Sequence, residues 1–453
     1  MSSPPSATLL PLLAALPFAA SLLLACLPNR ARRLVAWIAG LATLAGCALL
    51  FATAGPVFDG EVLRWSIEWL PTLGLELGFR IDGLAWLFAL LILGIGALVV
   101  LYAAYYLHHE DPPARFFMFL MLFMGAMLGV VLADNLVLLV VFWELTSLAS
   151  FLLIGYWSHR RDARQGARMA LAITGGGGLC LLAGVLLLGH VAGSYRLDDV
   201  LAAGPVIRDH PLYLPTLLLV LLGAFTKSAQ FPFHFWLPHA MAAPTPVSAY
   251  LHSATMVKAG VFLLARLYPA LGGTPEWFWL VTLTGLATLL VGAYLAIFEH
   301  DLKGLLAYST ISHLGLVTML FGLDTKMAVV AGVFHILNHA TFKASLFMSA
   351  GIIDHETGSR DMRRLNGLWK SMPVTGALGM VAAGSMAGVP LLNGFLSKEM
   401  FFAETVQRDS GWVLGIGLPL GATIAGIFSV AYSARFVHDT FFNGEPIDLP
   451  KTP

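Results

Sequence analysis

Residues 227–238 read KSAQFPFHFWLP, and they lie inside an apolar segment long enough to cross a membrane. Pro232 and Pro238 interrupt that segment, because proline removes a helix hydrogen bond and frees the carbonyl one turn earlier. Lys227 adds an ionisable side chain at the same place. A broken helix is tolerated in lipid only where protein or water satisfies the freed groups. The stretch therefore predicts a membrane-spanning helix with a break at which protein or water satisfies the freed backbone groups.

A second interruption lies in residues 388–394, GVPLLNG, around Pro390. The two interrupted segments are the seventh and the twelfth apolar segments along the chain. They are an odd number of spans apart, so they cross the membrane in opposite directions, which is typical of inverted repeats in transporters. The plainer alternative is a pair of ordinary proline kinks in a helix bundle.

The composition supports a membrane protein. Hydrophobic residues make up 58% of the 453 residues and charged residues 11%, whereas a soluble domain is roughly 25% charged. So few polar groups cannot cover a water-exposed surface. The net charge is zero and therefore does not point to nucleic acid. The three cysteines lie in apolar runs without the spacing of a disulfide framework or a zinc site.

The fold class that we predict is all-α and polytopic, with about 13 transmembrane helices, because each apolar segment of roughly 20 residues can span a bilayer about 30 Å thick. Two inverted five-helix repeats would contain the broken helices 7 and 12. The expected spans begin near Ala7, Leu34, Gly83, Phe116, Leu136, Met169, Leu212, Val247, Trp277, Gly304, Met327, Met372 and Trp412.

The predicted domain organisation follows from these spans. Residues 1–107 hold the first three helices and an extracytoplasmic loop, and residues 108–270 form the first repeat. Residues 271–440 form the second repeat, and 441–453 are a cytoplasmic tail.

The distribution of Lys and Arg predicts the orientation, because short cytoplasmic loops are enriched in both. With the N-terminus outside, the cytoplasmic loops carry Arg30, Arg32, Arg33, Arg115, Arg160, Arg161, Arg164, Arg168, Lys303, Arg360, Arg363, Arg364 and Lys370. The opposite side carries Arg64, Arg80, Arg196, Arg208, Lys326 and Arg408. This bias favours an N-terminus outside and a C-terminus in the cytoplasm.

Five ionisable residues lie inside the apolar spans: Glu144, Lys227, Lys258, Lys343 and Lys398. On insertion scales each costs about 2.5–3.5 kcal/mol, so five cost over ~10 kcal/mol unless they have partners. Buried ion pairs that merely hold helices together are the plainer alternative. We interpret the set as an ion pathway, in which Glu144 and Lys227 pair and each changes the other's proton affinity.

Histidines extend this pattern. His335, His339 and Lys343 stand at i, i+4 and i+8, so they stack on one helical face and can relay protons. His313 lies among hydroxyl-bearing residues at membrane depth, and His252 shares the eighth span with Lys258. A single histidine is more often a satisfied core residue, and an i, i+4 pair can bind a metal. No HExxH motif is present, which argues against a zinc hydrolase.

Three stretches together resemble a known family. Residues 142–147 (FWELTS), 227–238 and 244–260 (PTPVSAYLHSATMVKAG) are similar to the antiporter-like proteins shared by Mrp antiporters, respiratory complex I and membrane-bound hydrogenases. Residues 338–358 (NHATFKASLFMSAGIIDHETG) look most like the A subunit of Mrp-type Na⁺/H⁺ antiporters. The charged residues and the prolines match together, and the resemblance runs through essentially the whole chain.

The resemblance implies roles for the polar residues. Glu144 and Lys227 would form the proton-coupling pair, and Lys258 with the His252 region would carry protons inward. Lys343 and Lys398 would continue a polar axis across the subunit. With His313, His335 and His339, these residues are the proton-translocation site that we predict, and no metal or cofactor is part of it.

The expected function is that of one component of a multisubunit monovalent cation/proton antiporter in a bacterial inner membrane. It would carry Na⁺, K⁺ or Li⁺ against H⁺ and assemble with the other subunits of an Mrp complex. The alternative is a proton-pumping subunit of complex I or of a membrane-bound hydrogenase, driven by electron transfer in a partner. We find no nucleophile constellation for a membrane hydrolase. Because A subunits of this family carry a long C-terminal extension, a chain that stops at Pro453 is expected to be a fragment or to have its remainder encoded separately.

Overall fold

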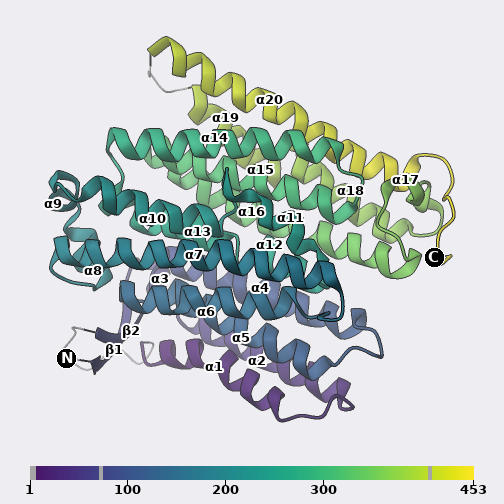
Figure 1. Cartoon of the computed structure of the whole chain (residues 1–453), viewed down its shortest axis with the longest axis horizontal. Coiled ribbons are helices and arrows are strands. Elements are labelled where there is room, and N and C mark those ends of the chain that lie inside the picture. The colour runs from purple at the N-terminus through teal and green to yellow at the C-terminus, as the bar shows by residue number, and fades with distance from the viewer. Residues whose placement is uncertain (1–6, 71–74, 407–410, 453) are drawn as a thin grey trace. The chain divides into compact units, whose positions relative to one another are not determined.

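The computed structural model describes residues 7–70, 75–406 and 411–452, so Arg408 and the last residue of the predicted tail, Pro453, lie outside the described part. Figure 1 shows helices throughout, with one short strand pair near the N-terminus. The all-helical fold predicted from the sequence is confirmed.

The chain divides into two compact units. Unit 1 comprises Met1–Lys227 and Ala254–Thr274, and unit 2 comprises Ser228–Ser253 and Pro275–Pro453. The division falls at Lys227, directly before the proline-rich break. The domain boundaries at residues 107, 270 and 440 stay a prediction.

Unit 1 is a helical bundle with one antiparallel β-hairpin. Within the bundle, α6 packs against α5 and α7. Asn135 caps α6 by accepting hydrogen bonds from the backbone N–H groups of Val137 (2.9 Å) and Leu138 (3.3 Å). The elements are α1 (Leu9–Ala25), α2 (Arg32–Ala52), α3 (Ala54–Phe58), β1 (Leu63–Leu70), β2 (Leu75–Ile81), α4 (Gly83–Tyr106), α5 (Pro113–Leu132), α6 (Leu136–Ile154), α7 (Arg161–Ala192), α8 (Leu197–Ala202), α9 (Gly204–Asp209), α10 (Tyr213–Lys227) and α13 (Lys258–Leu271).

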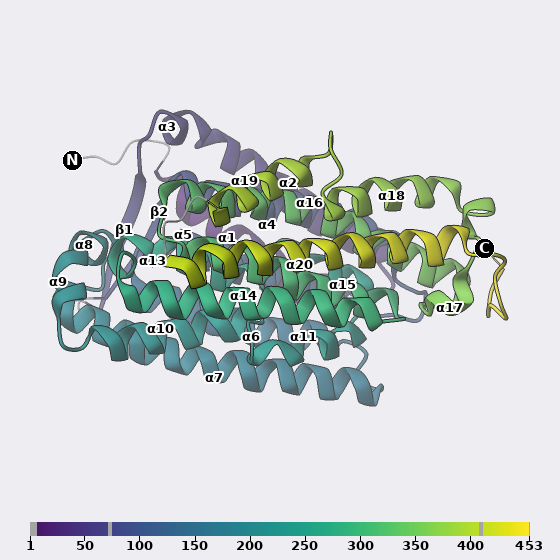
Figure 2. The ribbon, with the colours of Figure 1, turned by 90° about the horizontal axis from the view of Figure 1, so that it is seen from above.

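The apolar stretch of α15 is 94% buried inside the protein, whereas that of the span Gly415–Phe442, in α20 and η5, is 33% buried. α15 is therefore the central helix of unit 2. α14 and α15 lie side by side in both views (Figure 1, Figure 2). The elements are η2 (Phe233–Phe235), α11 (Trp236–His239), η3 (Ala240–Ala242), α12 (Thr245–Ser253), α14 (Pro275–Phe298), α15 (Leu302–Gly322), α16 (Lys326–Thr357), α17 (Met362–Leu365), η4 (Leu368–Lys370), α18 (Pro373–Ala387), α19 (Asn393–Val406), α20 (Gly411–Val437) and η5 (His438–Phe442).

Among the described residues, nine helical spans are long and apolar enough to cross a membrane, and α1, α10 and α18 are shorter apolar helices. The count of thirteen therefore stays a prediction. Both predicted breaks are present, because α10 ends at Lys227 and α18 ends at Ala387, before α19 begins at Asn393. Lys227 lies directly before the first break and Lys398 lies after the second, in α19.

The structure adds a break that the sequence analysis missed. The eighth span is interrupted between Ser253, where α12 ends, and Lys258, where α13 begins. No proline marks this interruption, and the sequence around it, SATMVK, is compatible with a continuous helix. His252 and Lys258 therefore belong to separate helices, one in each unit.

Candidate functional site

The site in unit 1 begins with Glu144, near the middle of α6. Its carboxylate lies against glycines of α7: a Cβ added at Gly178 would come within 1.5 Å of Glu144 Oε1, and one at Gly175 within 3.7 Å of Oε2. These two glycines belong to a run of four, residues 175–178, and glycine allows helices to pack closely. In the structure the absence of a side chain at Gly178 makes room for the Glu144 carboxylate.

Lys227 reaches the same turn of α6 from the end of α10. Its fully buried ammonium donates hydrogen bonds to the Trp143 carbonyl (3.1 Å) and to Ser147 Oγ (2.7 Å), and it lies 5.1 Å from the centre of the Trp143 ring. The charges of Glu144 and Lys227 interact. In the described part of unit 1, however, no ion pair joins them, and the buried Glu144 Oε1 has no hydrogen-bond partner. The structure thus brings the predicted pair into the same region without direct contact.

His252 lies in the interior of unit 2, between the rings of Trp236 (centroids 6.4 Å apart) and Phe347 (6.1 Å). The side chain is fully buried, and neither ring nitrogen has a hydrogen-bond partner among the described residues. Buried polar atoms are nearly always paired with protein or with ordered water. This imidazole is therefore a position where water is expected to enter the core.

Lys343 is one of the buried lysines of unit 2. From α16 its ammonium donates to Ser309 Oγ and, at 3.3 Å, to the Leu306 carbonyl, both on α15. It also lies 3.3 Å from Met386 Sδ on α18. Its hydrogen-bond acceptors are thus neutral groups.

Lys398 donates hydrogen bonds to carbonyl groups at the end of the broken helix α18. Its ammonium donates to the Met386 carbonyl (2.7 Å) and the Ala387 carbonyl (3.1 Å), the last two carbonyls of α18, and to Ser429 Oγ on α20 (2.8 Å). The sequence argument requires a partner for the carbonyls freed by this break, and the lysine provides it. Gly388 makes the approach possible, since its φ is +88° and an added Cβ would lie 2.9 Å from Lys398 Cδ.

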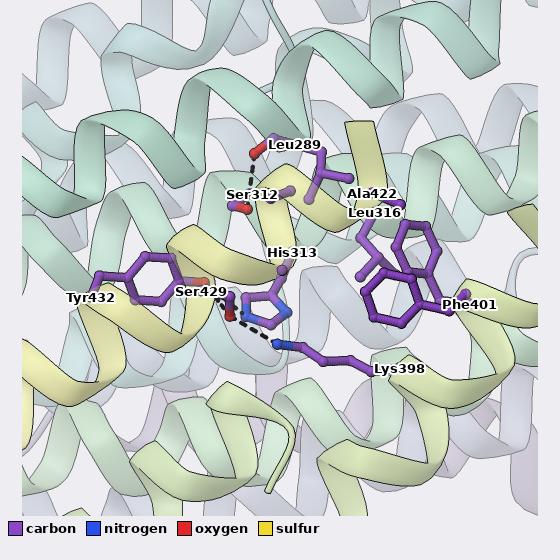
Figure 3. A pocket seen from close by; sticks show the side chains of 12 residues that line it. Leu289, Ser312, His313, Leu316, Lys398, Phe401, Ala422, Ser429 and Tyr432 are labelled. Carbon is purple, nitrogen blue, oxygen red and sulfur yellow. Dashed lines mark hydrogen bonds between the residues drawn. The ribbon is translucent and has the colours of Figure 1, made fainter. Parts of the chain in front are cut away.

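A chain of hydrogen bonds joins four helices of unit 2. Ser397 Oγ lies 2.9 Å from His335 Nδ1, and His335 Nε2 lies 2.9 Å from His313 Nδ1. His313 Nε2 lies 3.3 Å from the hydroxyl of Tyr432, which donates to Ser429 Oγ (3.0 Å). Since Ser429 also accepts from Lys398, the chain connects α19, α16, α15 and α20. Figure 3 shows its part from His313 through Tyr432 and Ser429 to Lys398. We call these six residues the histidine chain.

A cavity of about 20 Å³ adjoins the histidine chain and is lined by His313, Lys398, Ser429 and Tyr432, together with apolar side chains. Figure 3 shows the Lys398 ammonium and the His313 ring converging on Ser429. A space of roughly 10–15 Å³ accommodates one water molecule if it has polar partners. The cavity therefore has room for a water beside the two titratable groups.

The histidine chain can exist in two polarities. A neutral imidazole donates through one nitrogen and accepts through the other, so His335 and His313 can both point their N–H toward Tyr432, whose hydroxyl then donates to Ser429, or both away from it. In the second case the Tyr432 hydroxyl donates to His313 instead. Converting one polarity into the other moves one proton along the chain without moving a heavy atom. The arrangement is thus suited to proton transfer between the Lys398 region and the far end at Ser397.

His339 completes the predicted histidine stack on α16. Its ring centroid lies 5.4 Å from that of His313 and 5.4 Å from that of Phe342. His335, His339 and Lys343 all face α15, in line with the i, i+4, i+8 spacing. Within the described residues, no group of three or more His, Cys, Asp or Glu is arranged to hold a metal ion.

Sequence reasoning missed several site residues. Lys303 was expected in a cytoplasmic loop, yet it is 1% exposed at the start of α15 and donates to the Ala243 carbonyl at 2.6 Å. In the sequence alone, a lysine in the first turn of a helix cannot be distinguished from a lysine in the preceding loop. Tyr432 and Ser429 are uncharged residues of a largely apolar helix, and only the packing of α20 against α15 reveals them.

Comparison with known proteins gives the family. Residues 133–423 match the profile described as NADH:quinone oxidoreductase/Mrp antiporter, TM, and residues 67–117 match the one described as NADH-Ubiquinone oxidoreductase (complex I), chain 5 N-terminus. The chain belongs to the NADH:quinone oxidoreductase/Mrp antiporter transmembrane family. The family resemblance inferred from the sequence is confirmed.

Individual relatives in this family are similar over most of the chain. The A/B subunit of a probable K(+)/H(+) antiporter of Rhizobium meliloti is 63% identical, covering 96% of this chain and 44% of the relative. The A subunit of the Na(+)/H(+) antiporter of Alkalihalophilus pseudofirmus is 50% identical, covering 84% and 50%. In a solved structure of an Mrp complex from a Dietzia species, one chain superposes with a TM-score of 0.87 at 41% identity, covering 96% of this chain and 47% of that one. The chain thus spans about half the length of the relatives it matches.

The family match places the site within the shared region. All nine predicted proton-translocation residues, from Glu144 to Lys398, lie within the matched residues 133–423, whereas Ser429 and Tyr432 of the histidine chain lie beyond them. The roles of the nine residues stay a prediction from the sequence.

Proposed function

We propose that this chain is the proton-conducting, A-type part of a multisubunit monovalent cation/proton antiporter. The histidine chain carries the proposal, because it links two neutral imidazoles to a buried lysine through heavy-atom distances of 2.8–3.3 Å. The antiporter names of the similar A subunits support the same conclusion. The protein is a transporter component rather than an enzyme.

The proton route that we propose has one part in each unit. In unit 1, Glu144 takes and releases protons beside Lys227, whose ammonium is held by neutral acceptors. In unit 2, Lys343, His335, His339, His313 and Lys398 pass protons between hydroxyl groups and the water of the small cavity. His252 in unit 2 and Lys258 in unit 1 are the two further carriers that we propose.

The proposed location is a bacterial inner membrane with the N-terminus outside. The distribution of Lys and Arg among the loops supports this orientation. The proposed partners are the other subunits of an Mrp-type complex, and the transported cation is Na⁺ or K⁺, since the similar A subunits carry both names.

Reconstituted vesicles test the proposal. The complete complex is placed in vesicles with an imposed pH gradient and a pH-sensitive dye, and NaCl or KCl is added. We expect one of these cations to collapse the gradient. Choline chloride is the control for nonspecific salt effects and should leave the gradient intact.

A different result would favour the redox alternative. If neither cation affects the gradient while reduction of a quinone by the complex acidifies the lumen, the antiport proposal is wrong. A Glu144→Gln variant should impair transport under both mechanisms and therefore serves as a test of the site only.

A further inference from the structure

A groove of about 910 Å³ runs along the surface of unit 1 between α2 and α4, away from the proton site. One wall is a stripe of α2 that includes Ala36, Trp37, Gly40 and Leu41, and the opposite wall is a stripe of α4 from Ala97 to Tyr105. Its volume is near the upper end of the roughly 300–1,000 Å³ of ligand pockets. Large apolar side chains remain exposed along it, including Trp37 at 67% and Tyr105 at 82%.

One end of this groove is basic. Arg32, Arg33 and His109 line that end, where α2 begins and α4 ends. Arg32 is occupied, because its guanidinium donates to the carbonyls of residues 107, 108, 109 and 111, directly after the end of α4. The exposed Arg33 has no hydrogen bond or ion pair within the described part of the chain.

The start of α2 adds positive potential at the same end. Ala31 at the N-cap offers no side-chain acceptor, and the first turn contains no acidic residue. The uncapped N–H groups and the helix dipole therefore favour an anion. Of the two acidic residues in the adjacent loop, Asp111 is engaged by the Trp157 indole N–H (2.9 Å) and the His108 N–H (3.0 Å), and Glu110 is exposed.

We propose that this groove binds an anionic glycerophospholipid. Its acyl chains lie along the small and apolar residues between α2 and α4, and its phosphate lies against Arg33 and the start of α2. Trp37 and Tyr105 occupy the level of the headgroup, where aromatic residues are enriched in membrane proteins. Charge complementarity selects lipid over an apolar partner helix, because basic pockets between transmembrane helices are typical sites for anionic headgroups.

Native mass spectrometry of the complete complex in neutral detergent tests this site. Phosphatidylglycerol and phosphatidylcholine are titrated separately, and we expect the wild type to bind phosphatidylglycerol more tightly. Arg33→Gln should weaken phosphatidylglycerol binding about fivefold, the contribution of one interfacial cation, and leave phosphatidylcholine binding unchanged. Arg30→Gln is the matched control, because Arg30 is exposed near the start of the same helix but does not line the groove.

A groove-filling variant probes the acyl chains. A Cβ at Gly40 would meet only Val100 Cγ1, at 3.9 Å, so the first atom of a larger side chain has room, and the rest of the leucine in Gly40→Leu would extend into the groove. We expect it to weaken the binding of both lipids while the thermal unfolding midpoint stays at the wild-type value.

Four results would overturn the proposal. These are equal binding of the two lipids by the wild type, the same loss for Arg30→Gln as for Arg33→Gln, displacement of phosphatidylglycerol by millimolar inorganic phosphate, and release of a partner polypeptide by Gly40→Leu with lipid binding unchanged. The third result would indicate a free-phosphate site, and the fourth a helix-docking surface.

Discussion

At the scale of single residues, the buried lysines differ from ordinary ion-pair lysines in their partners. Lys227, Lys343 and Lys398 donate to carbonyl, hydroxyl and thioether groups, with no carboxylate in an ion pair among the described residues. A buried carboxylate in direct contact would hold the proton firmly. Neutral acceptors compensate for part of the desolvation cost and still allow the ammonium to lose its proton, which a relay requires.

Removing the Tyr432 hydroxyl should interrupt the histidine chain. For Tyr432→Phe we expect proton-coupled transport in vesicles to fall about tenfold. This is less than the roughly 10²–10⁴-fold contribution of a positioned acid or base. The effect is smaller because water in the adjacent cavity would replace part of the hydroxyl's role. Tyr294→Phe makes the same chemical change at a side chain that is 52% exposed, and should transport normally. Equal rates for the two variants would exclude Tyr432 from the route.

At the scale of elements, the glycine run of α7 shows how a helix face adapts to a buried charge. Residues 175–178 are four consecutive glycines in a 32-residue helix, where each costs roughly 0.5–1 kcal/mol relative to alanine. Gly177 and Gly178 face the side chains of Thr226 and Glu144, whereas a Cβ at Gly176 would meet nothing within 4 Å. Close packing thus explains particular glycines of the run rather than all of them.

Two alanine variants separate these roles. Gly178→Ala should displace the Glu144 carboxylate and lower transport strongly, and it should also lower the thermal unfolding midpoint. Gly176→Ala should keep wild-type transport and raise helix stability by roughly 0.5–1 kcal/mol. The measurement is transport in vesicles together with thermal unfolding in detergent. If Gly178→Ala and Gly176→Ala show the same transport and the same unfolding midpoint, transport does not depend on the present position of the Glu144 carboxylate.

At the scale of the whole molecule, an ion-pair cluster at the ends of helices ties the hairpin of unit 1 to its helices. Asp82 caps α4 and is bound by Arg80 (3.1 Å) on β2 and by Arg266 on α13, while Arg80 also pairs with Asp198 (2.9 Å). Burial alone would raise the pKa of Asp82, but hydrogen bonding and the charge of Arg266 outweigh burial and lower that pKa to about 2. Burial raises the pKa of the nearby Asp134, in spite of Arg80.

The cluster predicts a pH dependence of stability. Because the pKa of Asp82 is about 2 in the folded protein and about 3.9 in an unfolded chain, its ionised form stabilises the fold above pH ~4, and this contribution is lost as the pH falls toward 2. Asp82→Asn should therefore lower the free energy of unfolding on the order of 2 kcal/mol at pH 7. The difference from the wild type should shrink between pH 4 and pH 2, as measured by thermal unfolding in detergent. A difference that stays constant over that range would contradict the assignment.

The sequence by itself determined the fold class and the two proline-marked breaks, and it supplied nine titratable residues as candidates, because apolar length, proline and the cost of a buried charge are local properties. The tertiary structure decided the partners. It showed that Lys398 satisfies the carbonyls at the end of α18, that Glu144 lies against glycines of α7, and that Lys303 is buried. It also brought Tyr432 and Ser429 to the histidines, with Tyr432 reaching His313 from more than 100 residues away in the chain. A hydroxyl in an apolar helix carries no charge to reveal it, and its hydrogen-bond partner depends on which helices pack together.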